Sequence, residues 1–330
     1  MMTEIIKSTP YGLISKHRAE LMGVAIIWVL YGHSFLFPSS YLLRSLRVVA
    51  YTAVDMFFFI SGMSIYRSLT QNTTLDFLRH RFRRLLPVWW FFLVLNLCIG
   101  TRYSIQELAG YLTFTGYWMA YKGQGNWFVY AIVLFYILSP VMFGTLKDAK
   151  GSVLLLVLTF LLSIPFLGNE YLMRAFCRLP VYTLGMICAA VFDREPIGRQ
   201  GLIFAVIAFL SGALLIFSIF RCFGDSDALG SSGLFWYPCS LVVPPMTLLF
   251  ALLLDLKIAQ PLIKPLRFLG NASLEILLTS DFLLFSLGIW RDGRTVSFLF
   301  LVLVSVTIGE FLHWAVSSVL RYTAKGPRSS

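Results

Sequence analysis

Apolar residues occupy long runs along the chain, and short polar stretches separate them. A helix that crosses a membrane needs roughly 20 mostly apolar residues. Ten runs come close to that length: 18–37, 48–67, 84–101, 126–145, 152–168, 176–192, 200–220, 235–254, 268–289 and 295–319. The pattern therefore predicts an all-α fold, namely a polytopic transmembrane helix bundle of about ten spans.

The stretch 102–125 departs from this pattern because Arg102, Glu107 and Lys122 interrupt it. We expect a long loop here, with a half-buried segment from Leu108 to Met119. A spanning helix in this place would make the number of spans odd and would change the topology.

The composition agrees with a membrane protein. Apolar residues make up 58% of the 330 residues and charged residues 13%, whereas soluble domains have about 45–50% and about 25%. This excludes a disordered chain and an ordinary soluble enzyme. A net charge of +11 would suggest nucleic acid as the partner of a soluble chain.

Here, however, Lys and Arg concentrate in alternate loops by about two to one, as the positive-inside rule describes. That rule places both termini in the cytoplasm. We expect a cytoplasmic N-terminal segment at 1–17, a membrane domain at 18–320 and a cytoplasmic tail at 321–330.

Ionisable residues inside the spans are candidates for chemistry, because charges in a membrane are costly and usually functional or paired. In the first span, Arg18 and His33 share a helical face about 22 Å apart, with Arg18 at the cytoplasmic mouth. A neutral imidazole in the outer half is suited to take a proton from a substrate hydroxyl. The alternative is an interfacial histidine that hydrogen-bonds to a neighbour.

Asp55 in the second span shares a face with Gly62, where another backbone can approach closely. Its carboxylate is suited either to orient a histidine or a basic side chain, or to tie two helices together. Glu310 and His313, spaced i,i+3 in the last span, are expected to satisfy one another.

Arg81 and Arg84 stand i,i+3 in a basic cluster just before the third span. Planar guanidinium groups bind phosphate oxygens in a bidentate manner, so the pair is a candidate phosphate site. The alternative is a topogenic charge cluster or a contact with lipid headgroups. The five cysteines have no metal-ligand spacing, and we expect no metal site.

Six segments together resemble the bacterial acyltransferase-3 family of integral membrane O-acyltransferases. They are RAELMGVAIIWVLYGHS at 18–34, VDMFFFISGMSIYRSL at 54–69, RHRFRRLLPVWW at 79–90, NWFVYAIVLFYILSP at 126–140, RLPVYTLGM at 178–186 and LRFLGNASLEILL at 266–278. They occur in the family's order.

The resemblance implies a ten-helix membrane domain that transfers an acyl group, commonly acetyl from acetyl-CoA, to a carbohydrate hydroxyl. It implies a catalytic role for His33 and a donor-binding role for Arg81 and Arg84. Further residues fall at family-like positions: Glu20, Asp55, Trp127, Arg178 and Glu275.

Two places differ from the family's pattern. Many members carry an arginine eleven residues before the histidine, where this chain has Met22; Arg18, one turn earlier on nearly the same face, is a replacement. A tyrosine and a second histidine often follow the Ser-Leu-Glu motif, where this chain has Leu277 and Ser280. If the chemistry requires that second histidine, the protein is altered or inactive, and a scaffold subunit is an alternative.

We therefore expect an acyltransferase of the bacterial cytoplasmic (inner) membrane. It would move an acyl group, acetyl in the first instance, from cytoplasmic acyl-CoA to a hydroxyl of a cell-surface glycan or its lipid-linked precursor. The expected residues are His33, Glu20 and Asp55 for catalysis, Arg18, Arg81 and Arg84 for the donor, and Trp127, Arg178 and Glu275 for the substrate.

In this mechanism His33 acts as general base or transient nucleophile, and Glu20 or Asp55 fixes its tautomer. Arg178 would contact an acidic acceptor, or else lie at the interface as a snorkelling arginine. Lipids are expected partners, and nucleic acid is not. The alternative function is a transporter or flippase of a glycan or lipid-linked intermediate, with His33, Asp55 and Glu275 along a proton or substrate path.

Overall fold

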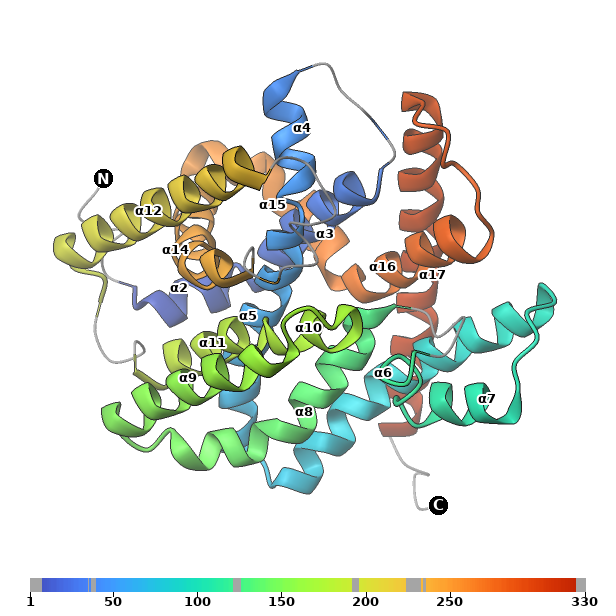
Figure 1. The fold of residues 1–330 in the computed structure, drawn as a ribbon, viewed down its shortest axis with the longest axis horizontal. Helices are drawn as coiled ribbons and strands as arrows, with labels where there is room; N and C mark the ends of the chain where they lie inside the picture. The colour runs from blue at the N-terminus through green and yellow to red at the C-terminus, as the bar shows by residue number, and fades with distance from the viewer. Residues whose placement is uncertain are drawn as a thin grey trace.

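A computed structural model describes residues 8–34, 36, 40–120, 126–191, 196–223, 233 and 236–324. Every regular element in this part of the chain is helical (Figure 1). The α-helices are α2 (Pro10–Lys16), α3 (Arg18–His33), α4 (Tyr41–Val48), α5 (Tyr51–Gln71), α6 (Thr74–Cys98), α7 (Ile105–Leu112), α8 (Trp127–Thr145), α9 (Ala149–Ser163), α10 (Glu170–Phe176), α11 (Leu179–Val191), α12 (Arg199–Phe223), α14 (Trp236–Asp255), α15 (Gln260–Asn271), α16 (Ser273–Asp281) and α17 (Thr295–Ala324). Shorter turns are η1 (Ile164–Phe166), η2 (Lys257–Ala259) and the π-helical η3 (Phe282–Ser286).

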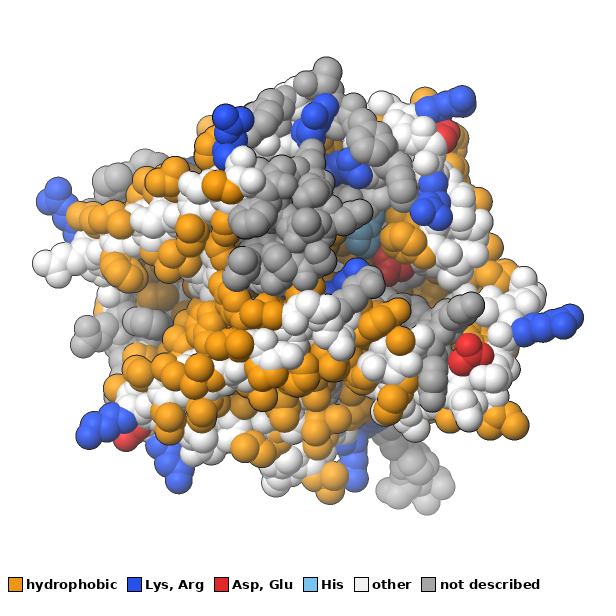
Figure 2. Space-filling model, viewed as in Figure 1, with side chains coloured by type: hydrophobic (Ala, Val, Ile, Leu, Met, Phe, Trp, Pro, Cys, Tyr) orange, Lys and Arg blue, Asp and Glu red, His pale blue; other side chains and the backbone are white. Residues whose placement is uncertain are grey.

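Six helical segments are long and apolar enough to cross a membrane, and two of them join consecutive elements, α9 with η1 and α10 with α11. A bent pair, 257–271 with 273–286, raises the number to seven if it forms one span. Figure 2 shows hydrophobic side chains spread over much of the visible face, with many Lys and Arg side chains toward its edges. The expected all-helical membrane bundle is therefore confirmed, with six to seven candidate spans.

The first three predicted spans also contain helices, and these helices are less apolar on average than the six candidate spans. The predicted first span is the 16-residue helix α3. The predicted second span is α5, in which Asp55 is fully buried. The predicted third span is the C-terminal part of α6, which begins ten residues earlier than expected because Thr73 caps it by accepting a hydrogen bond from the Asp76 N–H. The basic cluster is therefore helical.

The stretch 102–125 forms a short helix, α7, followed by turns as far as residue 120, and 121–125 lie outside the described residues. A capping box between Ser104 and Glu107 starts the helix. Eight residues rise only about 12 Å, too little to cross a membrane. Tyr111 is buried and stacks on Trp89 with ring centroids 4.3 Å apart, so this segment is half-buried as expected.

Glycines allow two close helix pairs that fix the position of α3 and α5. A Cβ atom at Gly62 of α5 would lie 2.2 Å from the Tyr182 carbonyl oxygen of α11, which confirms the close backbone approach expected there. A Cβ atom at Gly270 of α15 would lie 1.7 Å from the Ala19 carbonyl oxygen of α3. These contacts hold α3 against α15 and α5 against α11.

The chain changes direction twice around α16. The axes of the bent pair differ by 62° at Ala272, between α15 and α16. At the other end of α16, the α-helix passes directly into the π-helical turn η3 after Asp281. Figure 1 shows α16 beside α17 and near α3. This placement brings the two ends of α16 to the two parts of the candidate site.

Candidate active site

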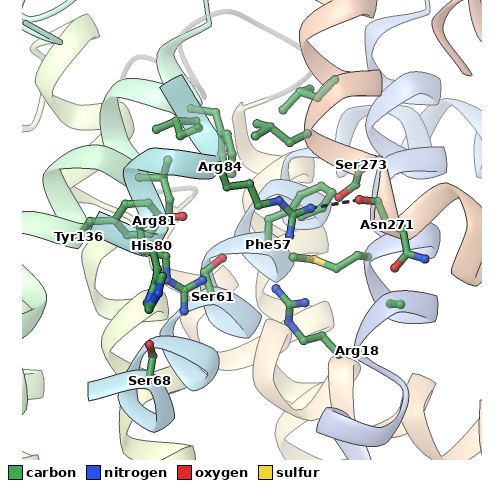
Figure 3. A pocket seen from close by; sticks show the side chains of 18 residues that line it. Arg18, Phe57, Ser61, Ser68, His80, Arg81, Arg84, Tyr136, Asn271 and Ser273 are labelled. Carbon is green, nitrogen blue, oxygen red and sulfur yellow. Dashed lines mark hydrogen bonds between the residues drawn. The ribbon is translucent and has the colours of Figure 1, made fainter. Parts of the chain in front are cut away.

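A cavity of about 340 Å³ lies between α3, α5, α6, α8 and the junction of α15 with α16. Three arginines line it: Arg18 at the start of α3, and Arg81 and Arg84 one turn apart on α6. Figure 3 shows their guanidinium groups directed into the same space. The structure thus brings together the three residues predicted to bind the donor.

These guanidinium groups are held by neutral oxygen atoms. Arg18 Nε donates to Ser64 Oγ at 3.0 Å, and Arg81 Nη2 lies 3.5 Å from the Ser64 carbonyl oxygen. Arg84 Nη2 donates to the Asn271 carbonyl oxygen at 3.1 Å. Within the described chain no carboxylate pairs with any of the three. Three clustered positive charges without a counter-charge favour an anionic ligand.

Met22 also lines this cavity, one turn beyond Arg18 on the same face of α3. The guanidinium of Arg18 lies in the cavity next to the position where many relatives of the expected family carry an arginine. The expected replacement of that arginine by Arg18 is therefore compatible with the geometry.

At the opposite end of α3, His33 faces a carboxylate of α16. His33 Nδ1 lies 3.3 Å from Asp281 Oδ1, and 28% of the His33 side chain is exposed. Asp281 Oδ2 accepts a hydrogen bond from the side-chain amide of Asn126, which caps α8. The Phe285 ring of η3 packs edge-on against the imidazole, with centroids 6.1 Å apart. His33, Asp281 and Asn126 form a connected polar group that we call the His33 cluster.

Two segments contribute residues both to the cavity and to the His33 cluster. Leu277 lines the cavity, and Asp281 lies four residues later on the same face of α16, about 6 Å along the helix. Phe128 also lines the cavity and lies two residues after Asn126. The cavity with the three arginines and the His33 cluster are therefore joined by neighbouring residues of α8 and α16.

The two carboxylates expected to orient His33 lie elsewhere, and that prediction is wrong. Glu20 is buried and accepts hydrogen bonds from Arg267 Nε at 2.9 Å and Nη2 at 2.5 Å. It lies thirteen residues before His33 in one helix, about 20 Å away. Glu20 instead ties α3 to α15, where the two helices touch.

Asp55 pairs with Arg178 instead, at 2.9 Å between Oδ1 and Nε. The Arg178 guanidinium lies 4.6 Å from the centre of the Trp127 ring and 3.7 Å from that of Trp236. Arg178 Nη1 also donates to the Arg174 carbonyl oxygen at 2.7 Å.

Both members of this pair are buried, with 1% of Arg178 and none of Asp55 exposed. Asp55 thus has the second role considered from the sequence, a polar tie between helices. The Arg178 guanidinium is not exposed to an acceptor, because its charge is enclosed by Asp55 and two indole rings.

Glu275, another predicted substrate residue, is also buried, at 1% exposure. Its Oε1 lies 3.3 Å from His313 Nδ1, which connects α16 to α17. The expected mutual pairing of Glu310 and His313 is therefore wrong: the nearer partner of His313 comes from α16. Helical spacing relates neighbours within one helix, whereas here the packing of α16 against α17 decides the partner of His313.

Asp281 is the site residue that sequence reasoning did not assign. It belongs to the few ionisable residues inside a predicted span, which was the available signal. It immediately follows Ser280, which is fully buried and donates to the Leu277 carbonyl oxygen at 2.8 Å.

Comparison with known proteins identifies the family of this chain. Residues 21–315 match a family described as an acyltransferase domain, the acyltransferase-3 family. No curated protein and no solved structure matches the chain. The matched range contains His33, Arg81, Arg84 and Asp281 and covers most of the chain. The protein is an enzyme that transfers acyl groups, a multi-pass membrane protein, and it belongs to the acyltransferase-3 family.

Proposed function

We propose that this protein transfers an acetyl group from cytoplasmic acetyl-CoA to a hydroxyl of a cell-surface glycan or its lipid-linked precursor, in the inner membrane of a bacterium. Both termini are cytoplasmic in this proposal, and the helices that carry buried charges, α3, α5 and α6, complete a bundle of about ten spans. No metal takes part.

One observation carries the proposal. Arg18, Arg81 and Arg84 line one cavity without a carboxylate partner in the described chain, and α3 and α16, which contribute to its lining, carry His33 and Asp281 at their far ends. Acetyl-CoA has the matching shape: phosphates at one end, a long flexible arm, and a thioester at the other end. About 22 Å of α3 separates Arg18 from His33, and the arm would follow that helix.

Catalysis in this arrangement is acyl transfer assisted by a general base. His33 removes the proton from the acceptor hydroxyl as the oxygen attacks the thioester carbonyl carbon. The carbon–sulfur bond breaks, and the imidazolium returns the proton to the leaving thiolate of CoA. The partial exposure of His33 gives the acceptor access to the imidazole. The substrate-binding role of Trp127 stays a prediction.

The donor part of the proposal is tested by comparing acetyl-CoA with acetyl-pantetheine, which lacks the nucleotide phosphates. Arg81→Ala combined with Arg84→Ala should weaken acetyl-CoA binding by about 10- to 100-fold, because charge-assisted hydrogen bonds to phosphate are lost. The same variant should bind acetyl-pantetheine as the wild type does.

The matched control is Arg79→Ala, in the same basic cluster. Arg79 is exposed and pairs with Asp76 at 3.8 Å, and it does not line the cavity. Its substitution should leave the affinity for acetyl-CoA unchanged. Equal losses for both donors, or an equal loss in the control, would contradict a phosphate site at Arg81 and Arg84.

A further inference from the structure

The imidazole of His33 faces a carboxylate whose second oxygen is held by a hydrogen bond. Asp281 Oδ1 lies 3.3 Å from His33 Nδ1, and Asp281 Oδ2 accepts from the Asn126 amide. Hydrogen bonds of catalytic groups are commonly long in unliganded structures and shorten in the loaded complex. Glu20 and Asp55, the other carboxylates considered for this role, are engaged with arginines elsewhere.

The side chain of Asn126 is fixed by its role at the start of α8. Asn126 Oδ1 accepts a hydrogen bond from the Phe128 backbone N–H at 2.7 Å, as an N-cap residue does. Because the oxygen is used there, the amide nitrogen must point the other way, toward Asp281. Asn126 therefore satisfies Oδ2 of Asp281 and leaves Oδ1 for the imidazole.

The backbone at Asp281 is also unusual. The α-helix ends at Asp281, and the π-helical turn from Phe282 to Ser286 follows immediately. π-Helical turns are rare and occur frequently at functional sites. The turn supplies Phe285, whose ring packs against His33. The imidazole is thus held from one side by Asp281 and from another by the residue four positions later.

We propose that Asp281 is the positioning residue of the acyl transfer and that Asn126 holds it in place. This inference rests on the proposed function of His33. Asp281 Oδ1 accepts a hydrogen bond from the protonated Nδ1 of His33, so Nε2 carries the free lone pair that removes the proton from the acceptor hydroxyl. When the imidazolium forms, the Asp281 carboxylate stabilises its charge until the proton passes to the leaving thiolate. Asp281 touches neither substrate nor donor.

The geometry predicts an unusual pattern of variants. In Asp281→Asn, the fixed Asn126 amide attracts the new side-chain oxygen, so the new amide NH₂ faces His33 Nδ1. His33 is then forced into the other tautomer, with the proton on Nε2, where it cannot act as a base. We expect kcat to fall by about 10²- to 10⁴-fold, the usual contribution of general acid–base catalysis. KM for acetyl-CoA should stay unchanged.

Two further variants distinguish positioning from folding. Asn126→Asp alone places two carboxylates together and should also lower kcat. The double variant Asn126→Asp with Asp281→Asn reverses the direction of the hydrogen bond between them: residue 126 accepts from the new NH₂ and from the Phe128 N–H. The oxygen of residue 281 then faces Nδ1 again. We expect kcat to recover at least about tenfold over Asp281→Asn, because a small decrease in the activation free energy already raises the rate tenfold.

The tautomer of His33 can be observed directly, without an activity assay. Nitrogen NMR of the purified protein in lipid bilayers separates the two tautomers, and His33→Gln identifies the signal of His33 among the four histidines. We expect Nδ1-protonated His33 in the wild type and in the double variant, and Nε2-protonated His33 in Asp281→Asn. Asp292→Asn, an exposed acid in the loop after η3, is the matched control and should change nothing.

An unchanged kcat in Asp281→Asn, or an Nε2-protonated wild type, would overturn the inference. So would a double variant that recovers neither kcat nor the wild-type tautomer. Failure of the proposed function looks different: the wild type would then transfer no acetyl group, while the tautomers would still follow the residue at position 281.

Discussion

Asp55 of α5 and Arg178, just before α11, form an ion pair inside the protein, with 2.9 Å between Oδ1 and Nε. The guanidinium is enclosed between the rings of Trp127 and Trp236. The helices α5, α8 and α14 therefore each contribute one side chain that contacts the Arg178 guanidinium. Because Arg178 has no access to solvent, its charge depends on Asp55.

Removing one partner of this pair should destabilise the protein strongly. Asp55→Asn leaves the Arg178 guanidinium buried without a counter-charge, and we expect a loss of about 3–5 kcal/mol of unfolding free energy. Replacing both partners, as in Asp55→Leu with Arg178→Met, should cost less than the single change. Thermal or denaturant unfolding in detergent measures both.

Asp76→Asn is the control for that experiment, because its partner Arg79 is exposed and exposed pairs contribute about 0–1 kcal/mol. A loss in Asp55→Asn no larger than in this control would contradict a structural ion pair. A stable Asp55→Asn protein that has lost only activity would restore the catalytic role that the sequence suggested.

The contact between α5 and α11 should tolerate no side chain at Gly62. In Gly62→Ala the new Cβ would lie 2.2 Å from the Tyr182 carbonyl oxygen, so the two helices must separate. Overpacking of this kind costs about 1–3 kcal/mol. Gly144→Ala provides the comparison, since no atom lies within 4 Å of its new Cβ. Equal stability of the two variants would show that the helices are not in close contact.

Much of this architecture follows from the sequence because it depends on local pattern. Apolar runs show where helices lie, and Gly62 indicated a close approach that α11 makes. Arg81 and Arg84 were predictable as a pair on one helical face because they are spaced i,i+3. Partners across the bundle were not predictable, as the pairs of Glu20 with Arg267 and of His33 with Asp281 show.

The reason is physical. Residue spacing determines which side chains share a face of one helix, but the rotation of that helix against its neighbours determines which distant charge it meets. Glu20 and Asp55 were the two partners considered for His33, because spacing alone does not show which acidic residue the imidazole meets. In the structure the partner is Asp281, which lies at the end of α16, between the bend at Ala272 and the π-helical turn.

Arg18 should be replaceable by an arginine one turn further along α3. Arg18→Ala removes one guanidinium from the cavity and should weaken acetyl-CoA binding by about tenfold or more, as loss of a charged hydrogen bond does. Met22 lines the same cavity, so adding Met22→Arg should restore much of the affinity. Calorimetry of the purified proteins measures both changes.

The control for this rescue is Met22→Arg in the wild-type background, which adds a fourth guanidinium to the cavity. Its affinity for acetyl-CoA should equal or exceed that of the wild type. If Arg18→Ala binds acetyl-CoA normally, or if Met22→Arg restores nothing, Arg18 does not replace the arginine that many family members carry at position 22.

The most direct test of the whole account is transfer of a labelled acetyl group by the purified protein in lipid vesicles, with acetyl-CoA supplied on the side of Arg81 and Arg84 and a glycan acceptor on the other. The wild type should label hydroxyl groups of the glycan, and His33→Gln should bind acetyl-CoA normally but transfer nothing. Transfer at the wild-type rate by His33→Gln would contradict the account, as would a wild type that moves glycan across the vesicle membrane without acylating it.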